Sequence, residues 1–307
     1  MRNEGYTYDD RVGADAAGKS LLAYYAGRYR HSTTAQWQAH ICEGRIERNG
    51  RVERNPVQTL HAGDRLRWHR PPWVEQDVPT DMPVLWEGSG CIVLHKPEGL
   101  PVLPGGGFLR NTLLHIARGH YGPSLSPVHR LGRGTSGAIL CSRTTGAARV
   151  LAAAMREGSI GKRYLALVAG CDMSDDFIVT TPIGPVPYAP LGTIYAATPE
   201  GKPSISSCHV LQRDERENRA LLQVDIPTGR PHQIRIHCAA AGYPLAGDPL
   251  YQKGGLPLDG NAVPGDCGYH LHSWQLRFPD PDNQKEQSVV APPPPFLAAL
   301  LPPACSA

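Results

Sequence analysis

The chain of 307 residues has room for about two domains, and its 41% hydrophobic and 19% charged residues are the composition of an ordinary globular protein. Its formal net charge of +3 is only mildly basic, so a surface that binds a polyanion has to be local, and composition alone does not point to a nucleic acid. No run approaches the roughly 18 continuous apolar residues of a membrane-spanning helix, so we expect no membrane association.

The N-terminal segment carries no recognisable targeting signal. Residues 1–11 contain Glu4, Asp9 and Asp10 and lack an apolar core, a pattern that fits neither a secretory signal peptide nor a transit peptide poor in acidic residues. We therefore expect an intracellular protein, in the cytoplasm in the first instance, with an organelle left open.

Residues 14–74 form the first predicted domain. Apolar periodicity predicts two short helices, at residues 20–25 and 35–41, and Asn49-Gly50 predicts the tight turn of a hairpin. Two of its short elements, Gly44–Gly50 and Gly63–Leu66, resemble those of the small S4-type RNA-binding domain.

This first domain is rich in arginine. Arg45 and Arg48 lie in the predicted hairpin. Because arginine contacts phosphates and stacks on bases, we predict that both residues bind RNA. The alternative is a solvated hairpin whose arginines pair with the nearby Glu43, Glu47 and Glu53.

A proline-rich linker at residues 75–90 separates this domain from a second one at residues 91–300. Strands are predicted in the second domain at Cys91–His95, Ala138–Ser142, Tyr164–Val168, Ser204–Leu211 and Leu221–Ile226, and helices at Thr112–Gly119, Ala147–Glu157 and Pro231–Ala241. Because strands and helices do not alternate strictly, this pattern favours an α+β domain with one large, mostly antiparallel sheet over a doubly wound fold.

The glycine-rich segment Pro127–Gly137 is the most informative feature of the second domain. Its last six residues read G-x-G-x-x-G, the dinucleotide-binding pattern, but that site needs a helix directly after the glycines, whereas Ala138–Cys141 continue as a strand. A sharp turn without further function is a second alternative. We favour a loop that lets a polyanionic backbone come close, with charge and hydroxyl donors from its side chains: Arg130, Arg133, Thr135 and Ser136.

His129–Gly137 also resembles the H-R-L-D-x-x-T-S-G loop of the RluA-type RNA pseudouridine synthases. Five further segments resemble motifs of that family and occur in its order: Val93–Val102, Lys162–Val168, Thr228–Arg235, Gly247–Tyr251 and His270–Leu276. Any one of these motifs is weak, but their order makes the set specific. The resemblance implies the pseudouridine synthase fold, an α+β fold with a large, mostly antiparallel mixed sheet, here preceded by an S4-like domain.

The resemblance further implies an isomerase that converts uridine to pseudouridine in structured RNA, such as rRNA or tRNA. The N1–C1′ bond of the nucleotide breaks and a C5–C1′ bond forms, after the nucleotide has left its stack. Such a reaction uses no cofactor and no metal. We expect RNA as the partner of a monomeric protein.

The site residues follow from the same resemblance. Tyr164 matches the family's active-site tyrosine, Arg235 matches the arginine that pairs with its catalytic aspartate, and Gly132 stands where that aspartate is expected. The implied RNA contacts are His129, Arg130, Arg133, Thr135, Ser136, Arg230, His232 and Gln233. Separately, the turn before Pro231 predicts a helix with proline at its first position and free N–H groups for an anion.

Glycine at position 132 leaves catalysis open, because it has no side chain to act as nucleophile or base. Arg235 would then lack its local countercharge. A carboxylate from elsewhere, with Asp248 the nearest by motif order, could restore activity. Otherwise the chain is a catalytically silent RNA-binding protein of the same fold, or it uses a different route.

Neither histidine nor cysteine spacing favours a metal site. His232 and His237 are five residues apart, whereas a zinc pair on a helix is expected four apart. No C-x-x-C pair occurs, so we expect reduced, mostly buried thiols. The eight cysteines are Cys42, Cys91, Cys141, Cys171, Cys208, Cys238, Cys267 and Cys305.

Overall fold

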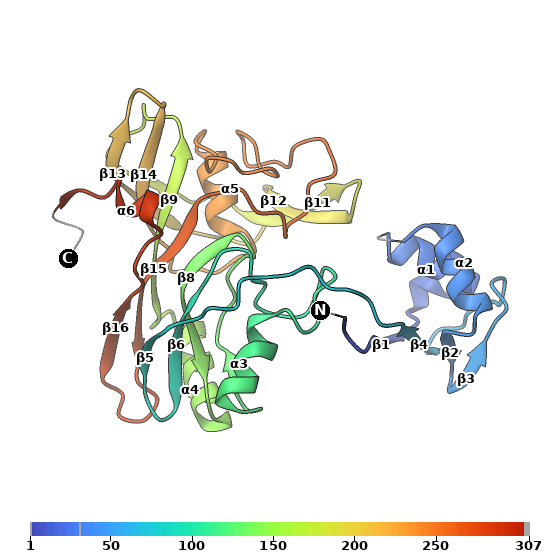
Figure 1. Ribbon diagram of the computed structural model, residues 1–307. Helices are drawn as coiled ribbons and strands as arrows, with labels where there is room; N and C mark the ends of the chain where they lie inside the picture. Colours follow the sequence, from blue (N-terminus) through green and yellow to red (C-terminus); the bar gives the residue numbers. More distant parts are fainter. Residues whose placement is uncertain (1, 31, 304–307) are drawn as a thin grey trace. The chain divides into compact units, whose positions relative to one another are not determined.

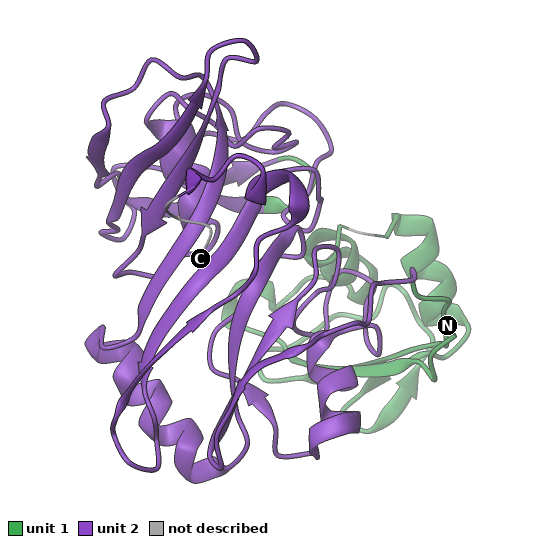
Figure 2. Ribbon diagram, turned by 60° about the vertical axis from the view of Figure 1, so that its left-hand side comes forward, with its two compact units in different colours: residues 1–75, 189–192 green, residues 76–188, 193–307 purple. Residues whose placement is uncertain are grey.

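The computed structural model describes residues 2–30 and 32–303. It divides into two compact units, which Figure 2 shows in different colours. Unit 1 comprises residues 1–75 and 189–192, and unit 2 comprises residues 76–188 and 193–307.

Unit 1 is a four-stranded antiparallel sheet with two α-helices (Figure 1). The strand order is β1-β4-β2-β3. The elements are β1 (Tyr6–Arg11), a 3-10 turn (Ala14–Ala16), α1 (Leu21–Arg28), α2 (Thr34–Cys42), β2 (Ile46–Arg48), β3 (Arg51–Glu53) and β4 (Arg65–Arg70). Trp37 of α2 and Leu66 of β4 are fully buried in its core.

Local sequence explains where these elements begin and turn. The Thr33 hydroxyl accepts a hydrogen bond from the Gln36 N–H, and the Gln36 side chain accepts one from the Thr33 N–H, so a capping box starts α2. Asn49 and Gly50 both have positive φ, 52° and 81°, which suits the tight turn between β2 and β3. The predicted hairpin and the two predicted helices are confirmed. The strand β1 has no apolar periodicity and was not predicted.

Unit 2 contains a sheet of ten strands. Its order is β10-β13-β14-β9-β15-β8-β6-β5, with β16 paired to β15 and β7 paired to β8. The strands are β5 (Val84–Glu87), β6 (Cys91–Lys96), β7 (Ser126–Pro127), β8 (Thr135–Ser142), β9 (Gly161–Ala169), β10 (Asp176–Val179), β13 (Ser206–Asp214), β14 (Arg219–Asp225), β15 (Leu271–Pro279) and β16 (Glu286–Val290). Only the pairing of β15 with β8 is parallel among the described strands of this sheet. The predicted α+β fold with a large, mostly antiparallel sheet is confirmed.

Helices cover both faces of this sheet. The remaining elements are α3 (Leu113–Tyr121), α4 (Thr145–Glu157), α5 (Gln233–Ala240), the short α6 (Pro295–Ala298) and a separate hairpin of β11 (Ile183–Tyr188) and β12 (Gly192–Ala197). Successive strand residues point to opposite faces, so Leu94 packs in one cluster with α3 and α5, whereas Val93 packs in another with α4. The predicted strands and helices of this domain are all present. The strands β5, β7, β10 and β16, the short α6 and the β11–β12 hairpin were not predicted.

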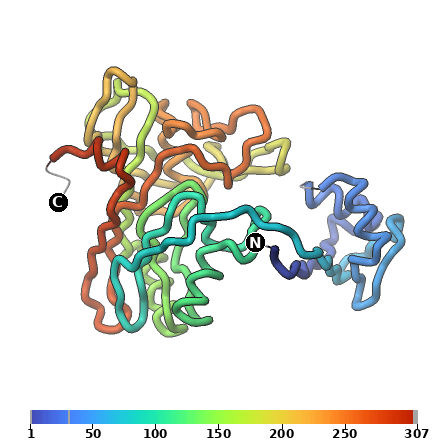
Figure 3. Tube along the Cα trace, viewed as in Figure 1, coloured from blue at the N-terminus to red at the C-terminus, as the bar shows by residue number. Residues whose placement is uncertain are grey.

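The strand β15 joins parts of the chain that are far apart in sequence. It lies between β9 and β8, and Leu271 pairs with Ala166 on one side and with Thr135 on the other. The end of the chain is therefore inserted beside its middle, as the red and green segments of Figure 3 show. Residues that directly precede β15 consequently lie beside the start of β8.

The expected helix start at Pro231 is wrong. Helix α5 begins at Gln233, after His232 in the left-handed region at φ 55°. The side-chain oxygen of Gln233 accepts the N–H of Arg230 at 3.0 Å. Because the glutamine occupies this N–H group itself, the turn does not present it to an anion.

Seven of the eight cysteines fall in the described part of the chain, and all seven are free thiols, as expected. Cys91, Cys141, Cys208 and Cys238 are buried, whereas Cys305 lies outside the described residues. Over residues 2–30 and 32–303, no helix has the length and apolar character needed to cross a bilayer.

Acid should destabilise this fold through His272, which is fully buried on β15. Its ring lies 2.8 Å from the Ser136 hydroxyl and 3.2 Å from the Ala291 carbonyl oxygen. Burial lowers the pKa of His272 from 6.5 to about 4. Between these values the unfolded chain binds a proton that the folded chain does not. The free energy of unfolding therefore decreases as the pH is lowered from 6.5 to 4, by up to about 3 kcal/mol.

Urea unfolding between pH 7 and pH 4 measures this effect. The His272→Gln variant should show a shallower pH dependence of the unfolding free energy than the wild type. The matched variant His115→Gln changes an exposed histidine on α3 and should keep the wild-type slope. Parallel curves for the wild type and His272→Gln would contradict the assignment.

Candidate functional site

Strand alternation places Tyr164 on the face of the sheet that α5 covers. Tyr164 on β9 belongs to the same buried cluster as Leu131, Ile234 and Tyr269. These residues therefore share the core on one face of the sheet. Tyr164 also pairs with Ser273 of β15, which pairs with Gly137 at the end of the glycine-rich segment. Burial raises the pKa of Tyr164 to about 12, against the opposing effect of a hydrogen bond with the Ser273 side chain. Its hydroxyl is thus protonated at neutral pH.

A buried ammonium group, that of Lys96, anchors the loop between β7 and β8. Lys96 is fully buried, and its Nζ donates to the carbonyl oxygens of Pro97, Leu100 and Arg133 at 2.8, 2.7 and 3.2 Å. Burial lowers the pKa of Lys96 to about 7. Three carbonyl acceptors compensate the buried charge and fix the loop at Arg133.

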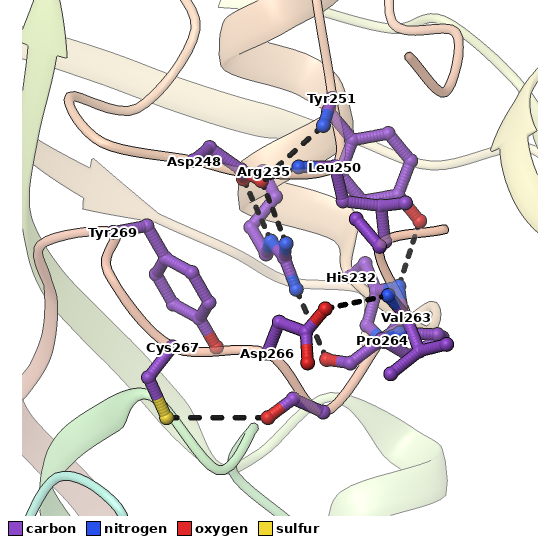
Figure 4. Close-up of polar contacts among 12 residues, drawn as sticks. His232, Arg235, Asp248, Leu250, Tyr251, Val263, Pro264, Asp266, Cys267 and Tyr269 are labelled. Carbon is purple, nitrogen blue, oxygen red and sulfur yellow. Dashed lines mark hydrogen bonds and ion pairs between the residues drawn. The ribbon is translucent and has the colours of Figure 1, made fainter. Parts of the chain in front are cut away.

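Arg235 is the third residue of α5 and is almost fully buried. Its Nε and Nη2 donate to the two carboxylate oxygens of Asp248, both at 2.7 Å, and its Nη1 donates to the Pro264 carbonyl oxygen at 3.2 Å. The guanidinium carbon lies 4.1 Å from the ring centre of Tyr269 and 5.1 Å from that of Tyr251. Figure 4 shows this bidentate pair and the two aromatic rings.

The expectation that Arg235 lacks a countercharge is wrong, because Asp248 supplies one. The same carboxylate also accepts the N–H groups of Leu250 and Tyr251, at 2.8 and 3.2 Å. With four hydrogen bonds and a side chain that is 1% exposed, Asp248 is fully engaged inside the protein. Because all four of these bonds are internal, Asp248 orients Arg235.

Gly132 is exposed, and a tyrosine hydroxyl lies directly beside it. A Cβ atom at position 132 would lie 2.6 Å from the Tyr269 hydroxyl oxygen and 3.3 Å from the Thr135 hydroxyl oxygen. These two hydroxyls are 3.3 Å apart. Tyr269 is 1% exposed, and its ring stacks on Arg235.

Most of the predicted RNA contacts near the loop are engaged within unit 2. His129 accepts the Leu140 N–H at 3.1 Å, and the Ser136 hydroxyl is bonded to His272. Arg133 donates to the Gly99 carbonyl oxygen and to the Gln76 side chain, both at 3.0 Å. RNA contacts by the His129 ring nitrogen and the Ser136 hydroxyl would compete with these bonds, whereas Arg133 has further N–H donors. The roles of all three residues stay predictions.

The candidates at the start of α5 are engaged as well. Arg230 donates to the Pro203 carbonyl oxygen, and the His232 ring lies 2.7 Å from the Tyr251 hydroxyl. Gln233 is buried and bonded to Thr228. Burial, then the charge of Arg235 and more weakly that of Arg130, lower the pKa of His232 to about 4.

That influence on His232 places the exposed Arg130 near α5. The roles of Arg130, Tyr164 and Arg235 in one RNA-binding site stay predictions. Its exposure makes Arg130 the loop arginine best placed to meet a polyanion.

Arg45 and Arg48 lie in unit 1 and are described there. Arg45 pairs with Glu43 at 2.5 Å, and Arg48 pairs with the buried Asp64 at 2.8 Å. Arg48 therefore helps to fix the turn of its hairpin, and Arg45 is the more exposed of the two side chains. The reading of both as RNA contacts stays a prediction.

Two aromatic residues of the site were not predicted. Tyr251 occurs in the quoted segment Gly247–Tyr251, so a signal for it was present. Tyr269 lies 137 positions after Gly132, and no spacing in the sequence connects them.

Comparison with known proteins decides the family. The profile described as RNA pseudouridylate synthase matches residues 90–240. An uncharacterized RNA pseudouridine synthase of Synechocystis is 44% identical over 274 residues, which cover 89% of this chain and 93% of that protein. The chain belongs to the RluA-type family of RNA pseudouridine synthases.

Further RNA pseudouridine synthases give the same result. RNA pseudouridine synthase 5 of Arabidopsis thaliana is 38% identical and covers 96% of this chain and 94% of its own length. The solved structure of human RNA pseudouridylate synthase domain containing 1 has a TM-score of 0.57 at 24% identity, covering 74% of this chain and 89% of that one, and supports the synthase fold.

Removing the charge of Asp248 should destabilise this synthase strongly. In the Asp248→Asn variant the buried Arg235 loses its countercharge, which costs about 3–5 kcal/mol of the free energy of unfolding. Asp225→Asn is the matched control, since its partner Arg163 is 32% exposed and Asp225 41%, and such a pair contributes about 1 kcal/mol or less. Urea unfolding measures both, and equal effects would contradict the central role of the buried pair.

Proposed function

We propose that this protein isomerises uridine to pseudouridine in structured RNA, namely rRNA or tRNA. The observation that carries the proposal is that Arg235 and Gly132 both lie against Tyr269, which belongs to the same core face of unit 2 as Tyr164. Ribosomal large subunit pseudouridine synthase D of Nitrosomonas europaea, 35% identical over 71% of this chain, supports an RNA substrate of the ribosomal kind.

Tyr164 supplies an aromatic face on a rigid strand. It lies in the interior of β9, which is paired on both sides, with β14 and β15. An everted uracil needs a flat apolar partner and a nearby hydroxyl, and a tyrosine fixed in a sheet offers both. Tyr164 therefore packs against the uracil in the proposed complex.

Arg235 supplies fixed positive charge without an ordering cost at the moment of binding. Its guanidinium is already oriented by Asp248 and enclosed by Tyr251 and Tyr269. A preorganised charge in a dry site stabilises negative charge that develops on the departing uracil. Such a charge is worth more there than on an exposed surface.

Turnover is tested by mass spectrometry of RNA from cells with and without the gene. Wild-type protein should restore a pseudouridine that the deletion strain lacks. In single-turnover assays with purified protein, Tyr164→Phe should have less than about one hundredth of the wild-type rate of pseudouridine formation. Tyr121→Phe is the matched control, because it removes a hydroxyl from a half-buried tyrosine that packs against the same core. It should behave as wild type.

The exposed Gly132 favours one competing function, a catalytically silent RNA-binding protein. The RNA of the deletion strain discriminates between the two. If its pseudouridine content is unchanged while the purified protein binds RNA, the silent function is correct and the proposed isomerase is not.

We further propose that unit 1 contributes to RNA binding through Arg45. Arg45→Glu should weaken RNA binding uniformly across sequences and reduce the slope of log affinity against log salt by about 1. Arg149→Glu makes the same charge change at an exposed position of α4, on the face of the sheet opposite Tyr164, and should leave affinity nearly unchanged. Equal losses in filter binding would show a nonspecific effect of charge instead.

A further inference from the structure

Gly132 and Gly134 flank one side chain, that of Tyr269. Neither glycine has φ in the left-handed region, so the backbone itself does not require glycine at either position. A Cβ at position 134 would lie 3.0 and 3.1 Å from the Tyr269 ring atoms Cζ and Cε1, and a Cβ at position 132 would lie 2.6 Å from the hydroxyl oxygen. Both glycines are therefore explained by the space that Tyr269 occupies.

Tyr269 cannot easily move away from the loop. Gly268, which precedes Tyr269, is packed tightly against Gly247, which precedes Asp248. A Cβ at Gly247 would lie only 2.2 Å from the Gly268 carbonyl oxygen. On its other side the ring stacks on Arg235, with 4.1 Å between the guanidinium carbon and the ring centre. The hydroxyl is thus fixed by the same ion pair that fixes Arg235.

We propose that the Tyr269 hydroxyl takes the place of the missing aspartate and acts directly on the target nucleotide as a hydrogen-bond donor. The inference rests on the proposed isomerase function. It explains why a carboxylate is absent at position 132: the hydroxyl already occupies the site that the first side-chain atom of an aspartate would need.

The chemistry of a phenol differs from that of a carboxylate. Burial raises the pKa of Tyr269, while Arg235 and the bond to Thr135 oppose this shift. The group is protonated at neutral pH and donates a hydrogen bond, whereas an aspartate would accept one or attack.

The donor is useful when the N1–C1′ bond breaks. The electron pair of that bond moves to N1 of the uracil and spreads over its carbonyl oxygens, where a fixed donor stabilises it. C5 then bonds to C1′ and gives its proton to solvent water, and N1 takes one proton from solvent water, so the product is an isomer of the substrate. Tyr269 keeps its own proton throughout, and no covalent bond to residue 132 forms.

The first experiment measures catalysis with purified full-length protein and RNA. Tyr269→Phe should lower kcat by about 100-fold or more with little change in KM, because one donor to developing charge is lost. Tyr121→Phe again controls for the loss of a hydroxyl from the core and should retain the wild-type kcat. An unchanged kcat in Tyr269→Phe, with an active wild type, overturns the inference and leaves the proposed function intact. An inactive wild type overturns both.

The second experiment tests the geometry without activity. Gly132→Ala should lower the midpoint of urea unfolding in the wild-type background and lower it much less in the Tyr269→Phe background. The reason is that the added Cβ would lie 2.6 Å from the Tyr269 hydroxyl oxygen, whereas the next atom of Tyr269 is 3.9 Å away. Gly134→Ala is the matched control, since its close contacts are with ring carbons and with the Cys267 Cα at 3.2 Å. Its cost should be the same in both backgrounds. Equal costs of Gly132→Ala in both backgrounds overturn the placement of the hydroxyl.

Discussion

The buried ion pair between Arg235 and Asp248 is the constraint around which the site is organised. Both side chains are almost fully removed from water, which is expensive unless every donor and acceptor is satisfied. The structure meets that condition with two direct bonds, two backbone N–H groups and the Pro264 carbonyl oxygen. A pair of this kind fixes direction more than it adds stability, and it sets the positions of the tyrosines that enclose it.

Much of the secondary structure of both units could be predicted because the sequence patterns that indicate it are local. Apolar runs and their alternation identify the strands that carry Leu94 and Tyr164. The hairpin turn at Asn49-Gly50 was equally readable, because few residue pairs accept positive φ at both positions. Strands without such a pattern, such as Tyr6–Arg11 with its mostly exposed residues, gave no signal.

The site could be predicted only in part. Motifs located the loop, Tyr164 and Arg235, but a motif does not say what a side chain bonds to. Asp248 was identified as the nearest carboxylate by chain order, whereas its role as the partner of Arg235 depends on tertiary contacts. The position of Tyr269 beside Gly132 arises from the insertion of β15 between β8 and β9, a long-range pairing that no sequence window contains.

The hydrogen bonds of the buried Lys96 have a consequence for the binding of the proposed RNA substrate. Its ammonium group donates to three backbone carbonyl oxygens. Two of them, those of Pro97 and Leu100, follow Lys96 closely in the chain, and the third is that of Arg133 in the loop. The backbone at Arg133 is therefore held without a ligand, and little chain entropy remains to be lost there on docking. On binding of the proposed RNA substrate, the adjustment therefore falls on the nucleic acid, which has to evert its uridine.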